Sequence, residues 1–216
     1  GMIVNERITA YINSLEVPGS DISEQIKKEA LADRVPIIRS ETASLLKFFV
    51  SFAKPMQILE VGTAVGYSAI MIREVMPAGA AITTNEKYEP RIPVARENFR
   101  RAGKEGVITL LEGDAMEWLA RLSGPYDMIF MDAAKGQYIH FFPEIMRLLS
   151  DGGILISDNI FQDGDIMESR FAVTRRNRTI HSRMREYLYT LKHTEGLATS
   201  LIPIGDGVAV STKKKG

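Results

Sequence analysis

The chain has 216 residues, 45% of them hydrophobic, which is enough to bury a sizeable core within one domain. Lys and Arg together number 27, and so do Asp and Glu, so the net charge is zero and bulk charge gives no support for nucleic-acid binding. The lack of cysteine excludes disulfides and thiolate metal sites, and no apolar run reaches the roughly 18 residues that a membrane span needs. These features predict a cytoplasmic protein without membrane contact.

Three helices are predicted before the first strand. Apolar residues recur at helical spacing over residues 3–15, and Asp21 with Glu24 can form a capping box for a helix over 21–33. Ser40 can cap a third helix that closes before Pro55. We expect residues 1–55 to form a helical cap. Their apolar side chains predict a homodimer, although a monomer could use the same side chains as core.

Strands and helices then alternate, which predicts a parallel sheet covered by helices on both faces. A polar helix over 168–193 follows, and an Asp-Gly turn at 205–207 indicates a hairpin of the runs 198–204 and 208–211. The predicted fold is α/β and Rossmann-like: a doubly wound, mostly parallel seven-stranded sheet with a C-terminal antiparallel hairpin. Residues 1–216 would form one domain with its core over 56–216. The predicted strands are 57–61, 80–85, 107–111, 126–131 and 153–157, and the helices between them are 67–76, 88–102, 114–122 and 138–149.

A glycine-rich turn follows the first predicted strand. Gly62 and Gly66 let the backbone turn sharply and approach a ligand before a helix begins at Tyr67. The G-x-G-x-x-G dinucleotide motif is not present, and Glu60 would repel a pyrophosphate. Glu60 would instead attract a ligand with cationic groups, such as S-adenosylmethionine. An ordinary strand-to-helix turn is the alternative.

Acidic residues end the next two predicted strands, where open α/β sheets bind ligands. Glu86 follows the second strand, and a carboxylate at this point commonly accepts hydrogen bonds from both hydroxyls of a ribose. Asp114 follows the third strand. It could meet an adenine amino group or cap the next helix, and the two roles are compatible.

The fourth and fifth strands end at Asp132 and at Asp158-Asn159. If both strands lie beside the first, these carboxylates come close, because neighbouring strands are about 5 Å apart. Two close carboxylates and an amide oxygen suit Mg²⁺, Mn²⁺ or Ca²⁺. Two helix caps would give the same pattern. Lys135 could be a salt-bridge partner of these acids or a general base with a lowered pKa.

Six arginines lie between Arg170 and Arg185, and three lysines, Lys213–Lys215, lie near the C-terminus. A solvated helix face and a frayed terminus would explain both groups. A local positive field beside a site would also suit a phosphate backbone, so tRNA is a candidate partner. The three histidines, His140, His181 and His193, stand singly and are interpreted as structural or surface residues.

Three motifs together resemble the cation-dependent O-methyltransferases, a family that includes catechol and caffeoyl-CoA O-methyltransferases. They are the run Ile58–Ser68, the stretch Asp132-Ala133-Ala134-Lys135, and Asp158-Asn159, and the resemblance extends over nearly the whole chain. Within the family, the chain is most similar to the bacterial tRNA 5-hydroxyuridine methyltransferases, through 35–37, 62–70, 132–138 and 202–207. Ile38 stands where that subgroup carries methionine, and Asn85 is polar where an apolar residue is usual.

The resemblance implies roles for individual residues. S-adenosylmethionine would be held by Ile38, Glu60, Gly62, Ser68, Glu86, Gly113, Asp114, Ala115 and Asp132. Asp132, Asp158 and Asn159 would bind Mg²⁺, and Lys135 would take the acceptor proton. A metal that chelates two vicinal oxygens predicts an acceptor with such a pair. Both 5-hydroxyuridine in tRNA, giving 5-methoxyuridine, and a small catechol meet this requirement. The arginine segment and the resemblance favour tRNA.

Overall fold

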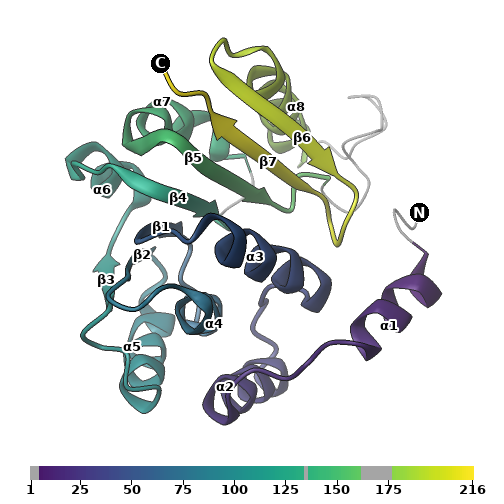
Figure 1. The fold of residues 1–216 in the computed structure, drawn as a ribbon, viewed down its shortest axis with the longest axis vertical. Helices are drawn as coiled ribbons and strands as arrows, with labels where there is room; N and C mark the ends of the chain where they lie inside the picture. Colours follow the sequence, from purple (N-terminus) through teal and green to yellow (C-terminus); the bar gives the residue numbers. More distant parts are fainter. Residues whose placement is uncertain (1–4, 134–135, 162–176) are drawn as a thin grey trace.

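The structure is a computed structural model, and it describes residues 5–133, 136–161 and 177–216. Seven strands form one sheet in the order β3-β2-β1-β4-β5-β7-β6 (Figure 1). β1 to β5 run parallel, whereas β7 pairs antiparallel with both β5 and β6. The predicted seven-stranded fold with a C-terminal hairpin is therefore confirmed. The strands are β1 (Gln57–Val61), β2 (Ala81–Glu86), β3 (Ile108–Glu112), β4 (Tyr126–Met131), β5 (Leu149–Asp158), β6 (Leu197–Ile202) and β7 (Val208–Lys213).

The helices cover both faces of the sheet, because successive strand residues point to opposite sides. Ile58 and Phe130 pack in one core with α3, α4 and α5, and Leu59 and Ile129 pack in the other with α6, α7 and α8. The strand order reverses between β1 and β4, which is where such sheets bind ligands. The helices are α1 (Glu6–Ser14), α2 (Asp21–Ala32), α3 (Ser40–Ala53), α4 (Tyr67–Val75), α5 (Ile92–Arg101), α6 (Ala115–Arg121), α7 (Tyr138–Leu148) and α8 (Arg178–His193), with a 3-10 turn, η1, at Glu89–Arg91.

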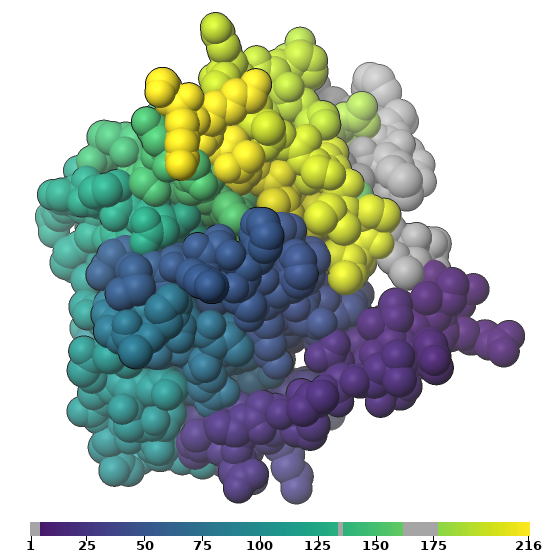
Figure 2. All heavy atoms as spheres, in the orientation of Figure 1, coloured from purple at the N-terminus to yellow at the C-terminus, as the bar shows by residue number. Residues whose placement is uncertain are grey.

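The predicted N-terminal cap divides into two parts. Ile26 of α2 and Leu46 of α3 are 1% exposed and belong to the main core. α1 contains no buried residue, although Ile8, Tyr11 and Ile12 give it an apolar stripe. It projects at the edge of the molecule (Figure 2). Helical spacing correctly predicted α1, but it did not show that this stripe would face outward.

The C-terminal part differs from prediction in two places. β5 begins at Leu149, four residues earlier than expected, and the pairing with β4 shifts between Tyr126–Leu149 and Met128–Ile154. The Asp-Gly-Gly sequence at 151–153 therefore lies in an irregular part of the strand and not in a turn before it. β7 extends to Lys213, whose ammonium group donates to the carbonyls of Met146 and Leu149 at 2.9 Å each. Lys213 is thus part of the sheet and not of a frayed terminus.

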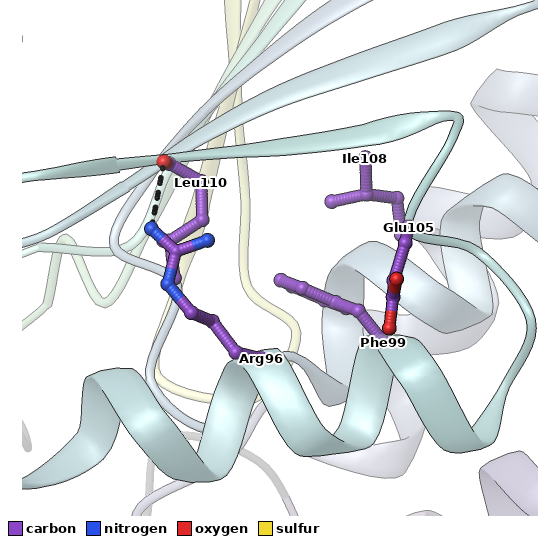
Figure 3. A pocket seen from close by; sticks show the side chains of 5 residues that line it. All are labelled: Arg96, Phe99, Glu105, Ile108 and Leu110. Atoms are coloured by element: carbon purple, nitrogen blue, oxygen red, sulfur yellow. Dashed lines mark hydrogen bonds between the residues drawn. The ribbon is translucent and has the colours of Figure 1, made fainter.

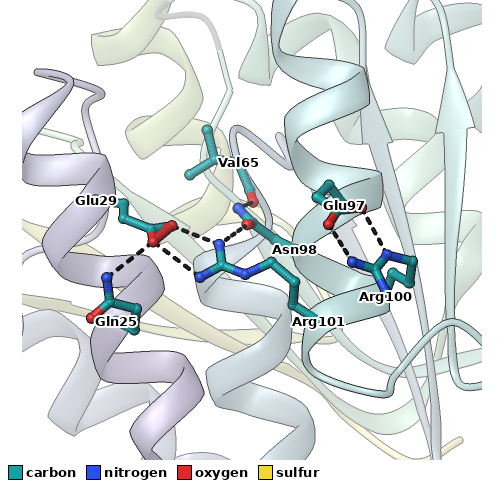
Figure 4. Close-up of polar contacts among 7 residues, drawn as sticks. All are labelled: Gln25, Glu29, Val65, Glu97, Asn98, Arg100 and Arg101. Atoms are coloured by element: carbon teal, nitrogen blue, oxygen red, sulfur yellow. Dashed lines mark hydrogen bonds and ion pairs between the residues drawn. The ribbon is translucent and has the colours of Figure 1, made fainter.

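Polar contacts fix α5 against its neighbours (Figure 4). Arg101 forms a two-pronged ion pair with Glu29 of α2, at 2.6 and 3.0 Å. Asn98 donates to the carbonyl of Val65 at 2.7 Å, which ties α5 to the glycine-rich turn. The described helices include none that is long and apolar enough to cross a membrane.

Candidate functional site

A cavity of 600 Å³ lies at the carboxyl ends of β1, β2 and β4, where the strand order reverses. Five of the predicted cofactor residues line it: Gly62, Glu86, Asp114, Ala115 and Asp132. Pro36, Asn85, Tyr88 and Phe141 line it as well. The structure therefore brings together residues that are up to about half of the chain apart, as expected from the topology of an open α/β sheet.

The glycine-rich turn packs directly against the end of β4. Gly62 has φ +107°, and a Cβ at this position would lie only 2.0 Å from the carbonyl oxygen of Asp132. The N–H groups of Gly62 and Thr63 donate to the carbonyl of Asn85, at 3.1 and 3.0 Å. Only glycine permits this approach of two backbones, so Gly62 fixes where Asp132 stands relative to the cavity.

Glu86 is held at the rim of the cavity by backbone donors. Its carboxylate accepts from the N–H of Ala64 at 2.7 Å on one oxygen, and from Lys87 and Tyr88 at 3.1 and 3.0 Å on the other. A carboxylate offers about four acceptor positions. The bonds orient the group and leave capacity for a ligand hydroxyl, which is consistent with the predicted ribose contact.

Glu60 and Ser68 lie behind the cavity wall and are not among its described lining residues. Glu60 is 0% exposed, and its two oxygens accept from Ser68 Oγ at 2.5 Å and Thr84 Oγ1 at 2.6 Å. Burial raises the pKa of Glu60 to about 7, against the lowering effect of these two bonds. Both oxygens of Glu60 thus bond to hydroxyl groups of the protein, and its predicted direct contact with a cofactor stays a prediction.

Asp114 and Gly113 are placed differently from each other. Asp114 occupies the N-cap position of α6, yet its side chain makes no capping hydrogen bond and faces the cavity region. The predicted capping bond is therefore not formed, and the ligand role of Asp114 stays a prediction. Gly113 has φ +120° and shapes the turn without lining the cavity.

The acidic pair lines a second, smaller cavity of 240 Å³. Asp132, Asp158 and Asn159 come together there, as their places at adjacent strand ends predict. The amide of Asn159 donates to Asp132 Oδ1 at 2.9 Å, and its backbone N–H donates to Asp158 Oδ1 at 2.8 Å. Asn159 has φ +59°, a conformation that asparagine tolerates better than most residues. Ile38 lines the same cavity and is 5% exposed.

Burial raises the pKa of both Asp132 and Asp158, and repulsion by Asp132 raises that of Asp158 further. A divalent cation between them would remove this repulsion. Two carboxylates and an amide oxygen form the hard donor set that Mg²⁺ prefers, so these residues fit the ion. In the described part of the chain, no group of three or more His, Cys, Asp or Glu residues is arranged to hold a metal.

Two further charged residues line this smaller cavity. Asp206, in the loop between β6 and β7, is 4% exposed, and Arg39 precedes α3. The sequence predicts a turn at 205–207, within a stretch that carries the family resemblance, but it predicts no site role for Asp206 or Arg39. The sequence signals that could have identified these two residues are the position of Asp206 between two glycines and that of Arg39 next to Ile38.

A third cavity, of 290 Å³, lies between α5 and β3 (Figure 3). It is lined by Arg96, Phe99, Glu105, Ile108 and Leu110. Arg96 pairs with Glu112 at 3.0 Å, so its charge is compensated within the chain. This cavity has no acidic pair, and the chemistry-bearing side chains gather instead at the ends of β1, β4 and β5.

Comparison with known proteins agrees with this geometry. The model of the O-methyltransferase family matches residues 16–214. The chain belongs to the O-methyltransferase family. It is 34% identical to a catechol O-methyltransferase of Niastella koreensis over 57% of this chain and 58% of that one, so the match spans less than two thirds of the relative.

Two solved structures share the fold over nearly all of the chain. A candidate caffeoyl-CoA O-methyltransferase of Staphylococcus aureus has a TM-score of 0.88 and 30% identity, and the match covers 97% of this chain and 100% of that one. The SAH-bound methyltransferase PaMTH1 of Podospora anserina has a TM-score of 0.86 and 27% identity, with full coverage of both chains. The prediction of an O-methyltransferase of the catechol and caffeoyl-CoA type is confirmed at the level of family. The closer likeness to tRNA 5-hydroxyuridine methyltransferases stays a prediction.

Several predicted residues of this O-methyltransferase lie outside the described residues, namely Lys135, Arg170, Arg175 and Arg176. Of the remaining arginines, Arg178 and Arg183 are half-buried on α8 and Arg185 is exposed.

The three histidines lie at structural or surface positions, as predicted. His181 is 2% exposed within the core side of α8, His140 is exposed, and His193 stacks on Tyr189 with ring centroids 3.8 Å apart.

Proposed function

We propose that the protein transfers a methyl group from the sulfonium of S-adenosylmethionine to a hydroxyl that has a second oxygen beside it. The observation that carries this proposal is that Asp132 and Pro36 line both the 600 Å³ and the 240 Å³ cavities. A cofactor in the larger cavity and an acceptor in the smaller one would meet at Asp132. The SAH-bound relative supports the choice of cofactor.

In this proposal, the residues around the larger cavity hold the cofactor. Glu86, fixed by three backbone donors, would accept hydrogen bonds from the ribose hydroxyls. Asp114 would accept from the adenine amino group, since no capping bond occupies its side chain. Glu60 would act from behind the wall by anchoring Ser68 and the glycine-rich turn. Gly62 would leave room for the cofactor beside Asp132.

Asp132, Asp158 and Asn159 would hold a divalent cation, with Mg²⁺ the ion that best suits oxygen donors. Such a cation, when bound, lowers the pKa of a hydroxyl and orients a vicinal oxygen pair. Lys135 would accept the proton of that hydroxyl as the oxygen takes the methyl group. The apolar side chains of buried Ile38 and half-buried Ile37 line the smaller cavity and would limit access of water to the reacting atoms.

The metal role is tested with the Asp158→Asn variant, which keeps the shape of the side chain and removes its charge. We expect methyl transfer from labelled S-adenosylmethionine to a catechol to fall by at least about 100-fold. Asp127→Asn is the matched control, because Asp127 lies at the opposite end of the sheet and accepts from the N–H groups of Met56 and Gln57. Full turnover by Asp158→Asn, or activity in EDTA, would show that the metal role is wrong.

A small catechol-type compound is the acceptor that the known relatives favour, as the Niastella koreensis and Staphylococcus aureus proteins illustrate. We propose such an acceptor first. The wobble 5-hydroxyuridine of tRNA is the second candidate, since its hydroxyl lies beside a carbonyl oxygen. Arg178, Arg183 and Arg185 support it by placing three cations on one helix.

The two acceptors are separated by one assay with both substrates. Transfer to tRNA that carries 5-hydroxyuridine should weaken steeply as salt rises, because phosphate contacts release counterions. Transfer to a neutral catechol should not change in this way. Arg185→Gln should reduce only the tRNA reaction. Lys214→Gln, measured in the same assay, tests whether the C-terminal lysines also contact tRNA. Turnover of catechol alone would leave the arginines as a solvated face.

We also propose that the protein forms a homodimer through α1. Asn13 joins α1 to Glu41 of α3 at 3.1 Å, but a nine-residue helix without buried residues gains little from packing, so burial of its apolar stripe against a partner would stabilise it. A second copy would present the same stripe, and two-fold symmetric contacts are self-complementary. Ile8, Tyr11 and Ile12 of the stripe are 56%, 66% and 43% exposed, and Leu15, directly after the helix, is 64% exposed. In sedimentation, the wild-type protein should be a dimer. Ile12→Glu should dissociate this dimer, and the control Tyr189→Ser, on α8, should leave it intact. A wild-type monomer would refute the proposal.

A further inference from the structure

A buried tyrosine lies directly behind the acidic pair. Tyr138 begins α7 and is 1% exposed. Its hydroxyl oxygen lies 3.1 Å from the carbonyl oxygen of Met131 and 3.0 Å from that of Asp158. Met131 is the last residue of β4, directly before Asp132, and Asp158 is the last residue of β5. One hydroxyl therefore contacts the backbone of both strands at the points where the two carboxylates emerge.

The position of this hydroxyl matters because regular pairing between β4 and β5 stops there. The last paired residues are Met131 and Ser157. Beyond this pair, nothing in a parallel ladder fixes the distance between the strand ends. A phenol at neutral pH has one proton to donate, and the two carbonyls share it. The shared proton draws the two strand ends toward one point.

A second tyrosine holds the first in place. The ring of Tyr187 from α8 meets that of Tyr138 edge-on, with centroids 5.5 Å apart and an interplanar angle of 71°. The Tyr187 hydroxyl pairs with Ser157 Oγ at 2.6 Å, next to Asp158. Both rings are completely enclosed, so neither can rotate without disturbing the core on that face of the sheet. Tyr187 thereby fixes the ring of Tyr138 without itself contacting the shared carbonyls.

We propose that Tyr138 is a positioning residue for the acidic pair: its hydroxyl clamps the ends of β4 and β5 at the separation at which Asp132 and Asp158 share one cation. This inference rests on the proposed metal-assisted function. Tyr138 does not line either cavity, so it would act only through the backbone of the residues that carry the ligands. Groups that orient metal ligands commonly change metal affinity by about 10- to 100-fold when removed.

The test compares Tyr138→Phe with Tyr187→Phe. Each variant removes one buried hydroxyl from the same cluster and keeps the ring, but only the first hydroxyl contacts the strand-end carbonyls. Mn²⁺ serves as the probe, and its Kd is measured by electron paramagnetic resonance on the intact chain. SAH affinity and Tm are measured in parallel. We expect Tyr138→Phe to raise the Mn²⁺ Kd by about 10-fold or more, with SAH affinity within about twofold of wild type. Tyr187→Phe should lower Tm and leave the Mn²⁺ Kd within about threefold.

Two outcomes would overturn the inference. If Tyr138→Phe lowers Tm but binds Mn²⁺ as tightly as Tyr187→Phe does, the hydroxyl is only structural. If saturating the protein with SAH restores Mn²⁺ binding fully, the effect is general loosening and not the clamp. Failure of the proposed function would give a different result. If the wild-type protein binds SAH but no Mn²⁺, the protein has no metal site, and the clamp has no role.

Discussion

Replacing Glu60 with glutamine should make the folded protein more stable at alkaline pH. Glu60 is 0% exposed, and burial raises its pKa from 4.5 to about 7. In the unfolded chain the group ionises near 4.5, so the folded state binds its proton more tightly over this range. Stability contributed by the protonated form is complete below about pH 4.5 and is lost as pH rises through about 7.

The size of the effect follows from the two pKa values. One pKa unit corresponds to about 1.4 kcal/mol, so the ionised group costs the fold about 3 kcal/mol above pH 8. Glutamine carries no charge and can replace the existing bonds, since its amide can donate to Ser68 Oγ and its oxygen can accept from Thr84. The gain in unfolding free energy over wild type should therefore grow by about 2 kcal/mol between pH 5 and pH 8.

Urea denaturation at pH 5, 6, 7 and 8 measures this difference directly. Glu29→Gln is the matched control, because hydrogen bonding to Arg101 lowers the pKa of Glu29 to about 2. Glu29 is ionised in both states above pH 5, so its substitution should shift stability by the same amount at each pH. A Glu60→Gln difference that stays flat from pH 5 to pH 8 would contradict the raised pKa, since it would mean that the buried carboxylate does not titrate in this window.

Two other substitutions test the packing of the site and of the C-terminus. Gly62→Ala should lower the free energy of unfolding by more than about 2 kcal/mol, because its φ is +107° and its Cβ would lie 2.0 Å from the carbonyl of Asp132. Gly103→Ala, with φ +66° and nothing within 4 Å, should cost only about 1 kcal/mol in urea denaturation. Lys213→Met should lower the free energy of unfolding, measured by thermal denaturation, by about 1–2 kcal/mol, because two hydrogen bonds to backbone carbonyls are lost. Lys214→Met, at an exposed position, should change it by less than about 0.5 kcal/mol. Equal effects at the two positions of either pair would contradict the structure.

Local pattern was enough to predict most of the fold. Alternating apolar strands and amphipathic helices, each bounded by glycine, proline or capping residues, predicted the order of all seven strands along the chain. The pattern failed at β5, where the Asp-Gly-Gly sequence at 151–153 has the composition of a turn but lies within the strand. Leu149 pairs with Tyr126 of β4, and pairing with both β4 and β7 continues from Ile154, so contacts on either side of 151–153 keep it within the strand. These contacts cannot be inferred from the segment alone.

The candidate site was also partly predictable, because parallel strands bring their carboxyl ends to one edge of the sheet. That rule predicts Glu86, Asp132, Asp158 and Asn159 at one edge of the sheet, and the structure places them there, around two cavities that share Asp132. It could not show that Glu60 points away from the cavity toward Ser68 and Thr84. The position of an acidic residue at a strand end does not indicate which hydroxyl groups will surround it.

The alternation of elements, the glycine of the turn and the residues that end each strand can be predicted from the chain, since they depend on neighbours along it. Three other features become visible only in the folded molecule: Asp206 and Arg39 join the acidic pair, Tyr138 bridges the ends of β4 and β5, and the stripe of α1 faces outward. These features depend on contacts between segments far apart in the sequence. Burial, which sets the pKa of Glu60 and the repulsion between Asp132 and Asp158, arises only when those segments pack.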